Sequence, residues 1–84
     1  MPKYPKDWRK EDNYLVREFV FENFIQAVDF VNKIVPLAEE QGHHPDIEIF
    51  SFKKVKVKLT THDEGYEITQ KDIALAEQIN NINI

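Results

Sequence analysis

Three histidines, His43, His44 and His62, are the side chains of this sequence best suited to chemistry at neutral pH. His43 and His44 are adjacent and precede Pro45, whereas His62 follows a segment of alternating apolar residues. Because an unperturbed imidazole has a pKa of about 6.5, it can donate or accept a proton near neutral pH. Two or three positioned rings could therefore catalyse elimination of water, one protonating a departing hydroxyl group while another removes a proton from a neighbouring nitrogen or carbon atom.

The same residues also have plainer interpretations. His43 and His44 could cover the C-terminal end of a helix, where the helix dipole favours a cation, and His62 could be an ordinary loop residue. Each histidine, considered alone, is more typical of such a position. A zinc site of three histidines is disfavoured, because adjacent histidines on a turn fixed by proline point in different directions. The chain has no cysteine, so it offers no disulfide, thiolate ligand or thiol nucleophile.

The elements that must position these histidines begin with a predicted hairpin. Residues 8–11 and 14–21 are expected to form two strands joined by a tight turn at Asp12 and Asn13. Trp8, at the start of the first strand, is by itself more typical of a core residue than of a ligand platform. In the second strand, apolar residues share one side and have charged neighbours: Leu15, Phe19 and Phe21.

A long helix is predicted over residues 24–40. Asn23 can cap it, with Gln26 three residues later, and Gly42 marks the end. Pro36 lies inside, where it removes a backbone hydrogen bond and should bend the last turn and a half. The predicted buried face is formed by Phe24, Ala27, Val28, Val31, Val35 and Ala38.

The second half of the chain predicts two more strands. Residues 47–52 change alternation between Ile49 and Phe50, which suggests a β-bulge. Residues 54–60 alternate apolar residues with lysines, as in an antiparallel sheet with one wetted face. Such a lysine row is typical of a solvated sheet face or of an edge strand guarded against aggregation.

A second helix is predicted to begin at Thr69, with Asp72 three residues later to complete a capping box. Capping alone would explain a carboxylate at Asp72. The apolar side of this helix is formed by Leu75, Ala76, Ile79 and Ile82. The order strand, strand, helix, strand, strand, helix is typical of an α+β fold, in which a four-stranded antiparallel sheet carries helices on one face.

Length and composition narrow the class of protein. The 84 residues, 42% of them hydrophobic, fit a single domain, 1–84, with no second lobe to enclose a large cofactor. No stretch approaches the ~20 apolar residues of a membrane span. A net charge of −4 argues against duplex nucleic acid as a partner. We therefore expect a cytoplasmic protein without a membrane or nucleic-acid partner, and the absence of cysteine is consistent with a reducing compartment.

A longer pattern of residues surrounds the histidines. In chain order it comprises Glu39, His43, His44, Pro45, an aromatic residue at Phe52, His62 and Asp72, with Phe21-Glu22-Asn23-Phe24 and Leu59-Thr60-Thr61-His62-Asp63 around them. In this arrangement the chain resembles the pterin-4a-carbinolamine dehydratase family, from about residue 8 to residue 79. An ordered combination of this length is far more specific than any of its members.

The resemblance implies a dehydratase that removes water from 4a-hydroxytetrahydrobiopterin, or from a related reduced pterin, to give the quinonoid dihydropterin. It implies no metal and no bound cofactor. His43, His44 and His62 would line the site, one acting as the acid toward the 4a-hydroxyl group and another handling the N5 proton. The resemblance leaves open which ring has which role. It also implies a homodimer or homotetramer.

Six further residues take supporting places by the same resemblance. Glu39 would support the first histidine, with Asp72 as a possible second support, Thr60 and Thr61 would meet the polar edge of the pterin, and Pro45 and Trp8 would shape the pocket.

Three departures from the family pattern bear on these expectations. Few residues precede Trp8, so the N-terminal helix of many relatives is expected to be absent, which bears on assembly. Gly42 stands where an acidic or amide residue is common, which removes one support for the histidines. The stretch 45–52 is one residue longer than in many relatives and ends in Phe52 where tyrosine is frequent; a bulge at residues 49–50 would absorb the extra residue.

Two other functions remain open. The chain could be a non-catalytic, dimerising interaction module of the same fold, or it could dehydrate or bind another pterin. The intact set of three histidines favours an enzyme, because a scaffold does not need titratable groups at this spacing.

Overall fold

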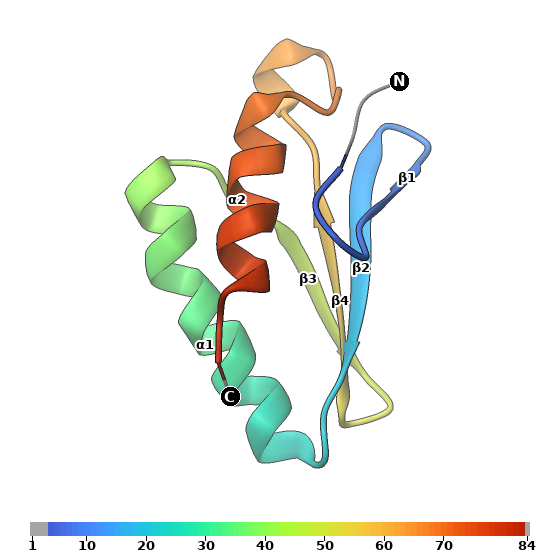
Figure 1. Ribbon diagram of the computed structural model, residues 1–84, viewed down its shortest axis with the longest axis vertical. Coiled ribbons are helices and arrows are strands. Elements are labelled where there is room, and N and C mark those ends of the chain that lie inside the picture. The colour runs from blue at the N-terminus through green and yellow to red at the C-terminus, as the bar shows by residue number, and fades with distance from the viewer. Residues whose placement is uncertain (1–3, 84) are drawn as a thin grey trace.

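The structure is a computed structural model that describes residues 4–83. Its elements follow the predicted order, with one 3-10 turn, His62–Glu64, before the second helix. They are β1 (Arg9–Glu11), β2 (Tyr14–Val20), α1 (Phe24–Gln41), β3 (Asp46–Phe50), β4 (Lys54–Leu59) and α2 (Gln70–Asn80). Figure 1 shows the strands in one sheet with both helices against the same face. The predicted α+β fold is therefore confirmed.

The four strands pair antiparallel in the order β1-β2-β4-β3, so β4 is an interior strand. Its lysines cannot guard an edge, and that interpretation of the lysine row is wrong. They lie on the sheet face away from the helices, where Lys56 is paired with Glu18 on one side and Glu48 on the other. Cross-strand neighbours of opposite charge stabilise an antiparallel pair. The lysine row is thus the charged centre of the outer sheet face.

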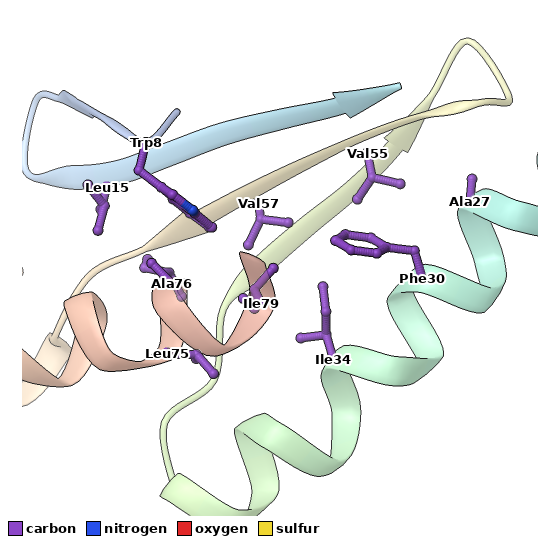
Figure 2. Close-up of a cluster of buried hydrophobic side chains, with 11 residues drawn as sticks. Trp8, Leu15, Ala27, Phe30, Ile34, Val55, Val57, Leu75, Ala76 and Ile79 are labelled. Carbon is purple, nitrogen blue, oxygen red and sulfur yellow. The ribbon is translucent and has the colours of Figure 1, made fainter. Parts of the chain in front are cut away.

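The core fills the space between the inner sheet face and the two helices (Figure 2). The face of α1 that enters the core agrees with the predicted one only in part. Ala27 and Ala38 are buried as predicted, whereas Phe24 and Val35 are about half exposed. Phe30 and Ile34, which were not predicted to be buried, also enter the core. This helix carries apolar residues on most of its circumference, so periodicity fits two faces equally well. The buried cluster comprises Trp8, Leu15, Ala27, Phe30, Ile34, Val55, Val57, Leu59, Leu75, Ala76 and Ile79.

The β3–β4 hairpin does not contain the predicted bulge. Its ladder is continuous from the Asp46–Lys58 pair to the Phe50–Lys54 pair. The change of alternation arises because Phe50 lies on the outer sheet face and the next aromatic residue, Phe52, belongs to the turn, with a left-handed φ of 52°. The bulge prediction is therefore wrong.

Three chain segments meet at one end of the sheet, at the top of Figure 1: the end of α1, the end of β4 and the start of α2. Their ends form as the sequence predicts, with Gly42 in the left-handed region at the end of α1 (φ 62°) and a capping box between Thr69 and Asp72 at the start of α2. Among residues 4–83, neither helix has the length and apolar composition needed to cross a membrane.

Candidate active site

All three histidines line one recess of about 200 Å³, at the end of the sheet where α1, β4 and α2 meet. Among the side chains that the structure describes, its lining is Gly42, His43, His44, Thr60, Thr61, His62, Asp63 and Lys71. Five of the nine residues singled out in the sequence therefore come together here. The other four lie around it or elsewhere in the fold.

The end of α1 sets the direction of the first histidine. The N–H of Gly42 donates to the Glu39 carbonyl (3.2 Å), and the N–H of His43 donates to the Ala38 carbonyl (3.1 Å). These two bonds form a Schellman motif, which requires a left-handed residue at its centre and therefore favours glycine. The chain reverses at Gly42, and His43 turns inward, where it is only 8% exposed.

A buried carboxylate fixes the His43 ring. Nε2 of His43 lies 2.5 Å from Oδ1 of Asp72, whose residue is fully buried. The other oxygen, Oδ2, accepts from the Thr61 hydroxyl and from the Thr69 backbone N–H, both at 2.8 Å. A carboxylate with both oxygens engaged cannot rotate freely. An ionised carboxylate only accepts hydrogen bonds, so Nε2 of His43 is the donor of this pair, and in the neutral ring the lone pair is then on Nδ1.

The second histidine has a different and more exposed partner. Nε2 of His44 lies 2.5 Å from Oε2 of Glu39, and both side chains are roughly two-thirds exposed. Glu39 was expected to support His43; the turn at Gly42 instead sends His43 to Asp72 and leaves His44 beside Glu39. Glu39 and Pro45 both line a neighbouring apolar recess of about 220 Å³, which shares His44 with the histidine recess.

The third histidine begins the 3-10 turn and is exposed. Among the side chains that the structure describes, none forms a hydrogen bond with the His62 ring. Its neighbour is the aromatic ring of Tyr66, with ring centroids 4.7 Å apart and planes inclined by 33°. His62 is thus held differently from the other two histidines.

The two threonines line the recess, but their hydroxyl protons are engaged elsewhere in the protein. Thr60 Oγ1 donates to the Asn13 carbonyl (2.8 Å), and Thr61 Oγ1 donates to Asp72. A hydroxyl group has only one proton to donate. Thr60 and Thr61 can therefore offer lone pairs, not hydroxyl protons, to a ligand while these bonds persist.

Trp8 does not reach the histidines. It is buried in the core among residues of the sheet and α2 (Figure 2) and is only 6% exposed. Its Nε1 donates to Oδ1 of Asn80 at 2.7 Å, at the far end of α2 from the recess. The plainer interpretation of Trp8 as a core residue agrees with this position, and Trp8 is not among the described residues that line the histidine recess.

Lys71 and Asp63 line the recess and were not singled out in the sequence. Lys71 lies in the first turn of α2 and Asp63 follows His62, and both are exposed. A lysine next to a capping carboxylate carries no sequence signal beyond that of a solvated helix residue. Among the described residues, the recess therefore combines imidazoles with the ammonium group of Lys71 and the carboxylate of Asp63.

The arrangement is suited to proton transfer. One buried imidazole is fixed by a carboxylate, and two exposed imidazoles share its recess, so groups that can accept and donate protons face one small volume. Among the side chains that the structure describes, no group of three potential ligands is arranged to hold a metal ion.

Comparison with known proteins identifies the family to which this chain is similar. The family model described as pterin 4 alpha carbinolamine dehydratase matches residues 1–82. A relative from Picosynechococcus sp., provisionally named a pterin-4-alpha-carbinolamine dehydratase, is 60% identical over 70 residues, covering 83% of this chain and 74% of its own. A relative from Sulfolobus acidocaldarius with the same provisional name is 45% identical over 75 residues, covering 89% and 80%.

Two solved structures are also similar. The crystal structure of a transcriptional coactivator/pterin dehydratase from Brucella melitensis matches with a TM-score of 0.81 and 32% identity, over 89% of this chain and 80% of that one. A pterin dehydratase-like protein identified as a RuBisCO assembly factor in the alpha-carboxysome matches with a TM-score of 0.67 and 23% identity, over 87% and 82%, which shows a shared fold alone. With a family model matched over almost its whole length and relatives this similar, the chain belongs to the pterin 4 alpha carbinolamine dehydratase family.

Proposed function

We propose that this protein removes water from a 4a-hydroxytetrahydropterin, such as 4a-hydroxytetrahydrobiopterin, to give the quinonoid dihydropterin. One observation carries the proposal: three histidines line a single recess, and the buried one is fixed by a carboxylate. Family membership names the class of substrate, and the histidines supply the acid-base groups that its dehydration requires. A recess of about 200 Å³ suits a compact bicyclic ring better than a larger ligand.

Within the pterin, two bonds break, C4a–O and N5–H, and one forms, the second bond between N5 and C4a; the acid gives one proton to the leaving oxygen and the base takes one from N5. The bond between C4a and the hydroxyl oxygen breaks as an acid protonates the hydroxyl group, which leaves as water. A base takes the proton from N5, and the electron pair of that N–H bond forms the double bond between N5 and C4a. The base thus ends with an extra proton and the acid without one, and exchange with solvent restores both.

We assign the base to His43. Its Nε2 donates to Asp72, so the lone pair of Nδ1 is available for the N5 proton. When the ring becomes an imidazolium, the carboxylate of Asp72 stabilises the new charge, as in other histidine–carboxylate pairs that act as bases. Burial keeps competing water away from this pair.

We assign the acid to His62 and a binding role to His44. His62 is exposed and, among the described side chains, has no hydrogen-bond partner, so it can be reprotonated from solvent after each turnover. His44 is already paired with Glu39, and it lies between the histidine recess and the apolar recess, where it would contact the polar ring of the pterin.

The experiment is a dehydration assay with freshly generated 4a-hydroxytetrahydropterin. His43→Ala and His62→Ala should each lower kcat by about 10²-fold or more, the range of a general acid or base. Lys56→Ala, on the outer sheet face, is the control and should keep the parent rate. Full activity in both histidine variants would overturn the assignment of the site.

We also infer that the protein self-associates. The resemblance implies homodimers or homotetramers, and α1 supports this with large apolar side chains that its own core leaves exposed: Phe24 (54%), Ile25 (71%) and Val35 (51%). Exposed apolar side chains that gather on one element are typical of protein interfaces. Sedimentation equilibrium should give a mass above that of one chain, and Val35→Glu should lower it. A single-chain mass at all concentrations would contradict the inference.

A further inference from the structure

We propose that Tyr66 is the positioning residue that holds the His62 imidazole in place for proton transfer, a role that rests on the dehydratase function proposed above. The three histidines of the recess are not equally restrained. Carboxylates hold two of them, His43 through Asp72 and His44 through Glu39. For His62 the described side chains offer no hydrogen bond, and its ring has one aromatic neighbour, Tyr66.

The backbone of a short closed loop brings Tyr66 to His62. Thr61 precedes the histidine and Glu67 follows the tyrosine, and these two residues form an isolated antiparallel bridge. The N–H of Thr61 donates to the Glu67 carbonyl at 2.9 Å. Inside the loop, the Tyr66 N–H donates to the Thr61 carbonyl at 3.1 Å. The loop therefore closes on both sides of the pair, and the two rings face each other across it, 4.7 Å between centroids.

The conformation of Tyr66 needs an explanation that the core does not supply. Its φ is +61°, in the left-handed region, which is costly for a residue with a Cβ atom and rare for a bulky one. The preceding residue, Gly65, also has a left-handed φ, +74°, which glycine adopts without strain because it has no Cβ atom. The tyrosine is 52% exposed, so burial does not compensate for the strain. Phe52 has a similar φ in the β3–β4 turn, but of the residues with a left-handed φ that the structure describes, Tyr66 is the one whose ring packs against a histidine of the recess.

The contact with His62 supplies that explanation. A histidine at the start of a short exposed turn would otherwise sample several side-chain rotamers, and only some of these point its ring into the recess. An aromatic ring packed against one face of the imidazole removes part of this freedom. Proton transfer depends on placement, since a displacement of about 1 Å can lower a rate by ~10²-fold. Tyr66 would thus do for His62, by ring packing, what the carboxylates do for the other two histidines.

Three substitutions separate the ring, the hydroxyl group and the backbone strain. Tyr66→Phe keeps the ring and should keep kcat within about twofold, because the contact is between rings. Tyr66→Ala removes the ring and keeps the strain, whereas Tyr66→Gly removes both. Both small variants should lower kcat by ~10-fold or more and change KM much less, because positioning acts on the proton-transfer step.

Thermal unfolding distinguishes a positioning role of Tyr66 from a purely structural one. Tyr66→Gly should unfold at the same or a higher temperature than the parent, since it relieves strain, and still lose activity. A glycine variant that keeps the parent kcat would overturn the role of Tyr66. So would a glycine variant whose loss of activity is matched by a loss of stability and is reversed at lower temperature.

NMR of the His62 ring protons tests the contact without any substrate. The ring current of Tyr66 should shift these protons in the parent and in Tyr66→Phe, and the shift should disappear in Tyr66→Gly. Equal shifts in the parent and the glycine variant would overturn the contact. A parent that shows no dehydratase activity would overturn the proposed function and this role with it, whereas an active parent with a fully active glycine variant overturns the role alone.

Discussion

Replacing Asp72 with asparagine should abolish most of the activity while leaving the protein folded. The carboxylate is fully buried and accepts three hydrogen bonds, from the His43 ring, the Thr61 hydroxyl and the Thr69 backbone N–H. An amide of nearly the same shape fits this place. Its oxygen can still accept from Thr61 and Thr69, and its NH2 group then faces Nε2 of His43.

The loss of activity follows from the tautomer of His43. Facing an NH2 donor, Nε2 must present its lone pair, so the proton moves to Nδ1 and the nitrogen that should accept the N5 proton no longer can. The analogous substitution in a serine-protease triad lowers kcat by about 10⁴-fold for this reason. We expect a loss between ~10²-fold and ~10⁴-fold here.

The cost in stability should be moderate for the amide and large for alanine. Asp72→Asn weakens one hydrogen bond between a ring and a charged group, about 1–3 kcal/mol. Asp72→Ala leaves three donors without their acceptor and removes part of the α2 cap, in total about 3–5 kcal/mol. Since small domains have total stabilities of about 5–15 kcal/mol, asparagine is the variant in which activity can be measured on folded protein.

The matched control is Glu39→Gln, the same carboxylate-to-amide change on the neighbouring histidine. That pair is largely exposed, so stability should change by less than about 0.5 kcal/mol. The assay is the dehydration rate beside urea unfolding. If Asp72→Asn is folded and keeps kcat within about threefold of the parent, Asp72 does not set the protonation of a catalytic His43, and the reasoning fails.

Three further substitutions test other contacts of the fold, each by urea unfolding. Gly42→Ala should destabilise the protein by about 1–2 kcal/mol through backbone strain alone, because an added Cβ meets no atom within 4 Å; an unchanged stability would contradict the left-handed turn. Asn80→Ala removes the acceptor of the Trp8 indole and should lower the free energy of unfolding by about 1–3 kcal/mol. Its kcat should not change, because Asn80 lies away from the recess, and a lower kcat would contradict that position. Lys56→Glu places a third like charge between two glutamates and should destabilise by about 0.2–1 kcal/mol, less in high salt, and an effect independent of salt would refute the electrostatic interpretation.

Most of the fold could be predicted because its signals are local. Asn23 caps α1, Gly42 ends it, and Thr69 with Asp72 begins α2, as expected. The buried face of α1 could be predicted only in part, at Ala27 and Ala38. With apolar residues around most of the helix, only the packing of α2 and the sheet decides which side is covered. The bulge failed for a similar reason, since the alternation at Phe50 reflects where the strand ends.

The sequence predicted which residues belong to the candidate site better than it predicted which residues they contact. Spacing indicated that the histidines gather, and the structure brings them to one recess. Their partners depend on the direction that the chain takes after Gly42, which pairs His43 with Asp72 and His44 with Glu39. Such directions are tertiary properties that no local pattern carries.

Two other residues show the same limit. Trp8 is conspicuous in the sequence as the single tryptophan, yet its indole is committed to the core and to Asn80. Tyr66 is inconspicuous, and its position beside His62 depends on the closure of a loop between Thr61 and Glu67. Residue type and spacing therefore indicated the chemistry, whereas the supporting contacts required the folded chain.

The most direct test of the central claim is the decay rate of freshly generated 4a-hydroxytetrahydropterin with and without this protein. We predict that the first-order decay accelerates in proportion to protein concentration, that quinonoid dihydropterin forms at the same rate, and that His43→Ala removes the acceleration. A decay rate that is the same with and without the parent protein would contradict the account.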